Sequence, residues 1–425
     1  MNRQIYNAYV AILHEELVPA LGCTEPIALA YCAALARKVL DGEADRMEVY
    51  CSGNIIKNVK SVTVPNSDGM RGIEAAAVLG YAGGDAEARL EVLESVKPGD
   101  IERARELLER KFCRCHHVRD VANLYIRVEL FAAEHTSEVT ISHHHTQVQC
   151  IRKDGAVLYQ REEETVEDTQ QQKELLNVRD ILEFADIVDL RDVKSLLERQ
   201  IRFNSAISDE GLQHEYGAEI GRTILETYGN QSVAVRAKAR AAAGSDARMN
   251  GCALPVVINS GSGNQGITCS IPVVEYGRQL QVSEDRLLRG LVVSNLVAIH
   301  QKKYIGSLSA YCGAVSAACG AGAGIAYLYG ESYQQISETI TNTIANIGGV
   351  VCDGAKSSCA AKIASSVDAA IMANNLTQRG RYFKSGEGLV ENSVEETIRN
   401  LGYVGKVGMK ETDNVILGLM IGENG

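Results

Sequence analysis

Twelve cysteines are spread over the 425 residues of this chain, and four in the C-terminal third have spacings that suit a metal or cluster site. Cys312 and Cys319 lie seven positions apart, so on a regular helix both can face one side. Cys352 precedes an Asp-Gly turn, and Cys359 begins a predicted helix. Thiols near turns and helix starts lose their proton more easily, as ligation requires. The alternative is that these small residues fill a tight core.

Three glycine-rich polar loops are candidates for binding a small anion. Two of them share the tripeptide Ser-Gly-Asn, at Ser52, Gly53 and Asn54 and again at Ser262, Gly263 and Asn264. The third covers residues 348–354. Such loops expose backbone amides and short polar side chains, which suit a carboxylate or a phosphate, although a tight turn without a ligand fits as well. Residues 261–266 have GxGxxG spacing but no βαβ setting, which disfavours a dinucleotide site.

Three further residues are candidates for catalysis. Cys23 lies just before Pro26, which fits the first turn of a helix, so we expect this thiol at a helix N-terminus. His300 and Lys303 belong to the segment His300-Gln301-Lys302-Lys303-Tyr304, which follows an apolar helix and carries two lysines. They could bind an anionic substrate, or they could be solvated cations that interact with the helix dipole.

Two histidine-containing segments are weaker candidates for a metal. Residues 143–145 are three consecutive histidines in a predicted strand, where alternate side chains point to opposite faces. A solvated strand face is therefore the better interpretation. The segment 113–117 pairs two cysteines with two histidines, and it is a weak metal candidate as well.

The composition excludes some classes of partner and compartment. The formal net charge is -11, and phosphate binding needs a basic face, so we expect no nucleic-acid partner. The first residues lack the apolar run of a secretion signal, which predicts a cytoplasmic protein with reduced thiols. Residues 306–330 are uncharged and long enough to span a bilayer, but they are rich in Gly, Ala and Ser. We therefore expect a buried helix and no membrane partner.

The periodicity of the chain predicts an α+β fold with a large, mainly helical body and a smaller α+β lobe that contains an antiparallel sheet. Residues 46–64 resemble a strand, a loop and a second strand, and residues 122–160 alternate as a meander of strands. Residues 161–173 are strongly polar and suit a linker or exposed loop. The predicted division is residues 1–44 and 170–425 for the helical body, which carries the catalytic site, and 45–169 for the lobe.

Long segments of the chain resemble the L-cysteine desulfidase family, which is related to the α chain of iron–sulfur-dependent L-serine dehydratases. The segments are EELVPALGCTEPIALAYCAA, CSGNIIKNVKSVTVPNS, SGSGNQGITCSIPVVEY, HQKKYIGSLSAYCGAVSAACGAGAGIAYL and GGVVCDGAKSSCAAKIASSVDAAIMA. This resemblance implies a 4Fe–4S cluster bound through three cysteines, with one iron open to substrate. The matching positions are Cys312, Cys352 and Cys359. The last loop is shorter than in the dehydratases, so Cys319 competes with Cys359 as the third ligand.

The resemblance also implies a lyase that releases sulfide, ammonia and pyruvate from L-cysteine by β-elimination. The open iron would act as a Lewis acid for the leaving group, and the Ser-Gly-Asn loops would hold the substrate carboxylate. Cys23 is the first candidate for the base, with Lys303 and His300 as alternatives. An L-serine or L-threonine dehydratase of the same mechanism, and a non-catalytic iron–sulfur sensor, are the alternative functions. The sequence leaves open whether the protein forms a homo-oligomer.

Overall fold

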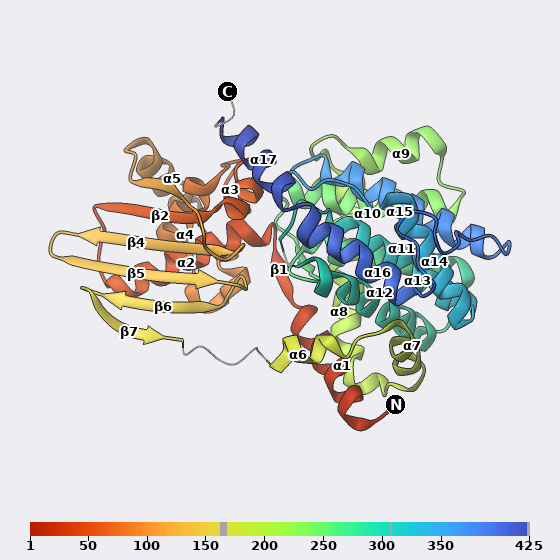
Figure 1. Ribbon diagram of the computed structural model, residues 1–425. Coiled ribbons are helices and arrows are strands. Elements are labelled where there is room, and N and C mark those ends of the chain that lie inside the picture. Colours follow the sequence, from red (N-terminus) through yellow and green to blue (C-terminus); the bar gives the residue numbers. More distant parts are fainter. Residues whose placement is uncertain (162–167, 307, 423–425) are drawn as a thin grey trace.

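The computed structural model describes residues 1–161, 168–306 and 308–422, which form a sheet lobe and a larger helical body (Figure 1). The expected α+β fold class is confirmed. The lobe has one six-stranded sheet, in the order β3 (Cys113–Val118), β2 (Arg46–Ser52), β4 (Tyr125–Ala132), β5 (His135–Ser142), β6 (Val148–Lys153) and β7 (Ala156–Gln160). The pair β2–β3 is parallel and the other neighbours are antiparallel, so the sheet is mixed.

Helices cover one face of the sheet, because alternate strand residues are apolar. In β4, for example, Ile126, Val128 and Leu130 are buried while their neighbours are more exposed. The helices of the lobe are α2 (Thr24–Leu40), α3 (Gly53–Val59), α4 (Ile73–Gly83), the short η1 (Ala86–Glu91) and α5 (Pro98–Glu109). Helix α2 shares its buried core with α4 and the sheet, although the predicted division assigns its residues to the helical body.

The body is built almost wholly from helices. They are α1 (Arg3–Glu16), α6 (Asp168–Glu174), α7 (Val178–Ile187), η2 (Leu190–Asp192), α8 (Lys194–Gln213), α9 (Ile220–Tyr228), α10 (Val233–Met249), α11 (Gly263–Leu280), α12 (Glu284–Ile305), α13 (Gly313–Tyr329), α14 (Tyr333–Ile347), α15 (Cys359–Thr377), α16 (Val394–Tyr403), η3 (Val404–Gly408) and α17 (Lys410–Ile421). A two-stranded ribbon of β1 (Pro19–Leu21) and β8 (Pro255–Val257) also belongs to it.

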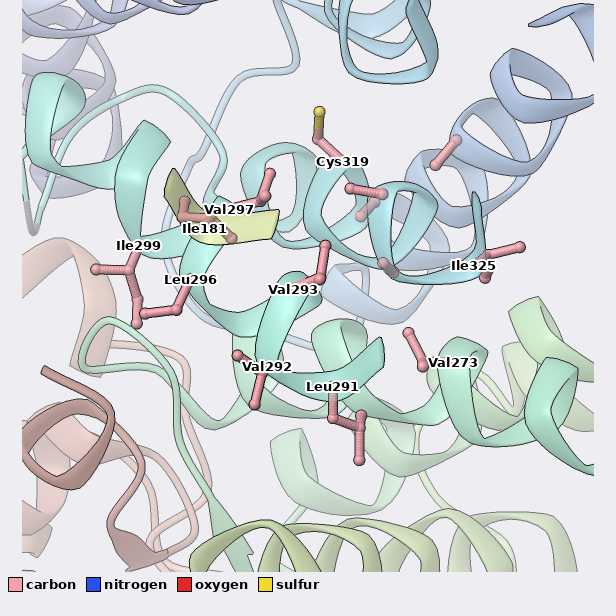
Figure 2. Close-up of a cluster of buried hydrophobic side chains, with 14 of the residues drawn as sticks. Ile181, Val273, Leu291, Val292, Val293, Leu296, Val297, Ile299, Cys319 and Ile325 are labelled. Carbon is pink, nitrogen blue, oxygen red and sulfur yellow. The ribbon is translucent and has the colours of Figure 1, made fainter. Parts of the chain in front are cut away.

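The centre of the body is the glycine- and alanine-rich helix α13. A Cβ on Gly320 would lie 2.3 Å from the carbonyl oxygen of Ser294, so glycine lets α13 approach α12 backbone to backbone. Figure 2 shows valine and leucine side chains of α12, such as Val293 and Leu296, packed in this core together with Cys319 of α13. Within the described parts of the chain, no helix combines the length and apolarity that crossing a bilayer requires.

Three local predictions differ from the structure. The expected loop after β2 is helix α3, because Ser52 caps it by accepting from the amide of Ile55. The segment 59–64, expected as a strand, joins the described sheet at no point and pairs instead with residues 70–72, around a bridge from Thr63 to Arg71. The three histidines 143–145 lie in the turn between β5 and β6 rather than on a strand. Residues 162–167 of the predicted linker lie outside the described residues, and α6 follows them.

Candidate active site

Four cysteines from separate parts of the chain line one cavity of about 110 Å³ between the two lobes. Cys23 precedes α2 and Cys312 precedes α13, each at the N-cap position. Cys352 lies in the loop between α14 and α15, and Cys359 is the first residue of α15. Three of the four therefore stand at the N-terminal end of a helix. The structure thus brings together the three predicted cluster ligands and Cys23.

A short stretch of strand-like pairing fixes Cys312 beside Cys352. The amide of Cys312 donates to the carbonyl of Val350 at 3.0 Å, and the amide of Cys352 donates to the carbonyl of Ala310 at 2.6 Å. The thiol of Cys312 donates a hydrogen bond to Cys352. This bond is the largest cause that lowers the pKa of Cys352 to about 6, and it raises the pKa of Cys312. One of the two sulfurs is therefore poised as a thiolate.

Cys359 and Cys23 complete the sulfur side of the cavity. The thiol of Cys359 donates to the carbonyl of Gly354 at 3.7 Å, and Cys23 lies 3.8 Å from the sulfur of Met249. Both cysteines belong to one small buried cluster. Burial raises the pKa of Cys23 to about 12, with only partial opposition from Arg248. The helix start that was expected to favour a thiolate at Cys23 is thus outweighed by desolvation.

Three lysines place positive charge around the cysteines. Lys57 and Lys362 both lower the pKa of Cys352, after the larger effect of the Cys312 hydrogen bond. Lys362 also contacts Asp353 in the same loop. Lys302 lines the cavity, and burial lowers its pKa to about 8 against the opposing effect of Cys352. This cationic surrounding suits an anionic group at the sulfurs.

The second Ser-Gly-Asn loop forms the opposite wall of the cavity. Ser262 caps α11, and both Ser262 and Asn264 line the cavity. Gly263 leaves room for Arg248, because a Cβ at position 263 would lie 2.3 Å from Nε of Arg248. Arg248 is 3% exposed and lines the cavity, and its Nε donates to the carbonyl of Gly22 at 2.9 Å. A guanidinium and the amides of a helix start are groups that can bind a carboxylate.

Several polar atoms in the walls are buried and have no hydrogen-bond partner. They are Nε2 of His145, Oδ1 of Asn264, Oε1 of Gln265 and the hydroxyl of Tyr311. His145 comes from the turn between β5 and β6, so the lobe reaches into the site, and its ring packs 3.2 Å from where a Cβ of Gly261 would lie. Burial lowers the pKa of His145, which favours the neutral imidazole. Unpaired polar atoms are costly in a folded protein, so they indicate a polar ligand.

The remaining predicted residues lie elsewhere. The first Ser-Gly-Asn loop, with Ser52, Gly53 and Asn54, lines a separate cavity of about 680 Å³ beside α17. Lys303 donates to backbone carbonyls of residues 173, 174 and 176, and His300 contacts Glu395 at 2.7 Å. Neighbouring positions on a helix point about 100° apart, which is why Lys302 faces the cavity and Lys303 does not.

A third cavity of about 540 Å³ adjoins the cysteine cavity. It is lined by Lys303, and it shares His145, Ser260, Gly261 and Lys302 with the cysteine cavity. Lys303 therefore lines the neighbouring cavity rather than the one that holds the cysteines.

Sequence reasoning missed Arg248 altogether. It considered His145 only as a weak metal candidate, and it included Lys302 and Gln265 in candidate segments without choosing them as site residues. Arg248 is the basic residue in the last turn of an alanine-rich helix, and a charge in a stretch of buried residues was a usable signal. His145 had no comparable signal, because its role depends on how the two lobes meet. Among the described residues, no three His, Cys, Asp or Glu side chains are grouped closely enough to hold a single metal ion. In a 4Fe–4S cluster each thiolate binds a different iron. Cluster ligands therefore need not lie as close together as the ligands of a single metal ion.

Comparison with known proteins connects this site to a family. The family model of the serine dehydratase alpha chain matches residues 87–418. A UPF0597 protein of Lachnoclostridium phytofermentans is 52% identical over 98% of this chain and 100% of its own length. UPF0597 proteins of Desulfitobacterium hafniense and Treponema denticola are 48% and 44% identical, each over at least 99% of both chains. The chain therefore belongs to the serine dehydratase alpha chain family, a family of lyases.

Proposed function

We propose that the protein is an iron–sulfur-dependent L-cysteine desulfidase, which releases sulfide, ammonia and pyruvate. The observation that supports this function is the convergence of Cys312, Cys352 and Cys359 on one cavity that also holds a buried arginine. The alternative substrate is L-serine or L-threonine, which the name of the matching family favours. Both reactions are β-eliminations from a small amino acid, and they differ in the leaving atom.

The residues of the cavity fit a 4Fe–4S cluster. Cys312, Cys352 and Cys359 would supply three thiolates, and the charges of Lys57 and Lys362 would offset the negative charge of the group. Three protein ligands would leave one iron open. When bound, the cluster supplies a Lewis acid that is soft enough to accept a sulfur leaving group.

The wall opposite the sulfurs carries groups that match both charged ends of an amino acid. Arg248 and the amides at the start of α11 suit the carboxylate, because they are fixed donors in a site with little water. The free oxygens of Asn264 and Gln265 suit the ammonium group.

Proton removal from Cα requires a basic atom that faces the substrate. Cys23 lines the cavity, but its raised pKa means that it carries its proton until another group removes it. The buried Nε2 of His145 is unpaired, and the lowered pKa keeps the ring neutral and able to accept a proton. We therefore place His145 beside Cys23 as a candidate base. Loss of the Cα proton and of the thiolate gives aminoacrylate, which water converts to pyruvate and ammonia.

The test is substrate discrimination by protein that has been purified and reconstituted without oxygen. L-Cysteine, L-serine and L-threonine are compared at equal concentrations, with keto acid, ammonia and sulfide measured together. The proposal expects pyruvate and sulfide in equal amounts from L-cysteine and a lower kcat/KM for the other two. Keto acid from L-serine without sulfide from L-cysteine would assign the protein as a dehydratase. Bound iron with no turnover of any of the three would contradict both.

A further inference from the structure

Glu25 lines the cysteine cavity, and the proposed reaction gives it no role. Among the described residues it is the only acidic side chain in the lining of that cavity, which also contains the cations Arg248 and Lys302. A carboxylate in such a place either stabilises the fold or binds a cation. The local structure around Glu25 shows which of the two explanations accounts for it.

The start of α2 explains part of the placement of Glu25. The chain passes from β1, which pairs with β8 of the body, into α2 of the lobe, at the junction between the two (Figure 1). Glu25 is the acidic residue in the first turn of α2, where the helix dipole stabilises a negative charge. The dipole accounts for the charge, but it does not account for a side chain that lines a cavity.

The neighbouring Thr24 holds the Glu25 carboxylate at the cavity wall. The hydroxyl of Thr24, which is fully buried, lies 3.0 Å from Oε2 of Glu25 and 2.9 Å from the carbonyl oxygen of Gly261. Thr24 therefore links the carboxylate to the loop that carries the second Ser-Gly-Asn tripeptide. Within the described parts of the chain, no lysine, arginine or histidine lies within ion-pair distance of Glu25. The protein thus holds a negative charge at the cavity without a cation to compensate it.

Arg248 is held near the same helix start, yet it does not pair with Glu25. Its Nε donates to the carbonyl of Gly22, which precedes α2, while the Glu25 carboxylate contacts Thr24. Both side chains line the cavity. Two opposite charges that line one cavity without touching each other suit a ligand that carries both charges. An α-amino acid is such a ligand, because its carboxylate and its ammonium are attached to the same carbon.

The two candidate bases feel both of these charges. After burial, which is the largest influence, Arg248 and Glu25 act in opposite directions on the pKa of Cys23. The same two charges also act in opposite directions on the pKa of His145, again after burial. An amino acid with its carboxylate at Arg248 and its ammonium at Glu25 would therefore present Cα, the atom that joins the two groups, near Cys23 and His145.

We propose that Glu25 binds the ammonium group of the substrate and so restricts the site to α-amino acids. Without this carboxylate, Arg248 and Lys302 would attract any small carboxylic acid. The unpaired oxygens of Asn264 and Gln265 are neutral acceptors for the other two N–H groups of the ammonium. The proposal rests on the proposed function for the identity of the substrate, and it makes Glu25 a binding residue rather than a base.

The test compares L-cysteine with 3-mercaptopropionate, which has the same carboxylate and thiol but no amine. Steady-state kinetics of the anaerobically reconstituted protein give KM and kcat for L-cysteine and the inhibition constant of the analogue. Glu25→Gln is expected to raise the KM about tenfold or more, because the ammonium loses a charged hydrogen-bond partner. The inhibition constant of the analogue should stay the same or fall, since the analogue has no ammonium to lose.

Two further variants separate binding from a structural role. Glu25→Asp keeps the charge on a shorter side chain, so its KM should lie between those of wild type and Glu25→Gln. Glu15→Gln is the matched control and should keep both wild-type constants, because Glu15 lines the neighbouring cavity and not the one with the cysteines. If Glu25→Gln raises the KM and the inhibition constant by the same factor, the residue acts on the fold and the proposal is wrong. An unchanged KM would overturn it as well.

Equilibrium dialysis with labelled L-alanine distinguishes failure of this proposal from failure of the proposed function. L-Alanine carries both charges but has no leaving group, so its binding does not depend on turnover. Wild-type protein that turns over no amino acid, yet binds L-alanine more tightly than Glu25→Gln does, would remove the proposed function and support the ammonium site. Turnover of L-cysteine together with equal binding of L-alanine by wild type and Glu25→Gln would remove the ammonium site and leave the function.

Discussion

Two pairs of neighbouring thiols in this protein have opposite surroundings. In the cavity, Cys312 donates to Cys352, and that hydrogen bond is the main reason why the pKa of Cys352 falls to about 6. In the sheet lobe, Cys51 of β2 donates to Cys115 of β3. Burial there raises the pKa of Cys51 well above its ordinary value, and the hydrogen bond to Cys115 adds to the rise.

Part of the contrast is the direction of the hydrogen bond, because Cys352 accepts it and Cys51 donates it. The rest arises from what surrounds each pair. The charges of Lys57 and Lys362 and the amide of Gly354 stabilise negative charge on Cys352. The titratable neighbours of Cys51 are further thiols, and each of them raises the pKa of Cys51. Proximity of two cysteines is therefore not enough to make a ligand. Cations and backbone amides favour a thiolate in one pair, and without them the other pair remains two small side chains in a core.

The largest expected effect comes from removing a cavity cysteine. Cys352→Ala deletes a proposed ligand, so bound iron should fall sharply and turnover should drop about 100-fold or more, beyond the loss typical of residues that merely support a ligand. Cys312→Ala and Cys359→Ala should behave alike. Cys51→Ala and Cys115→Ala are the matched controls and should keep wild-type iron. Anaerobic iron and sulfide analysis checks this, and iron loss in the controls would reverse the comparison.

Helix starts and turns are visible locally, so the sequence could mark cysteines at such positions as candidates. The choice of three of them came from the family resemblance, and their role as ligands stays a prediction. Cys312 and Cys359 are examples, each beside the start of an apolar helix. The helical body and the meander of strands were predictable for the same reason, since burial follows the period of each element. The relationship to the serine dehydratase α chain is confirmed. The narrower desulfidase activity stays a prediction.

What the sequence could not predict depends on how distant segments meet. The two Ser-Gly-Asn loops are identical as tripeptides, yet Ser262 faces the cysteines and Ser52 lines another cavity. Lys302 and Lys303 are adjacent, and helix rotation alone decides which one reaches the cavity. His145 enters from the other lobe. None of these outcomes follows from local pattern, because each is set by tertiary packing.

The second-largest effect is expected from the cavity wall opposite the cysteines. Arg248→Met removes the buried guanidinium, and we expect the KM for the amino acid to rise about 30-fold, because losing one partner of a buried charge pair costs about 2 kcal/mol or more. Arg240→Met on the same helix is the control, since Arg240 is paired with Asp209 and Glu275. Steady-state kinetics of the loaded enzyme measure both. Equal KM values would show that the carboxylate binds elsewhere.

A smaller effect should come from Lys302, whose native pKa of about 8 lies below its ordinary 10.5. Between pH 8 and pH 10.5, the Lys302 side chain keeps its proton in the unfolded chain but has lost it in the native protein. The free energy of unfolding contributed by Lys302 therefore rises with pH from 8 to 10.5, by at most about 1.4 kcal/mol per pH unit, and is constant below that range. Urea unfolding of wild type and Lys302→Met across this range tests it. Curves that stay parallel would mean that Lys302 keeps its ordinary pKa.

The smallest effect is expected at Cys319, the alternative third ligand. It is fully buried in the helical core, and its thiol donates to the carbonyl of Ile340 at 3.6 Å, away from the cavity lining. Cys319→Ala should cost about 1 kcal/mol of stability through lost packing and leave bound iron unchanged. Thermal unfolding and iron analysis of Cys319→Ala and Cys359→Ala, measured in parallel, test this prediction. If Cys319→Ala loses iron and Cys359→Ala retains it, the sulfur that completes the site comes from the core of α13, and the cavity is not where the cluster binds.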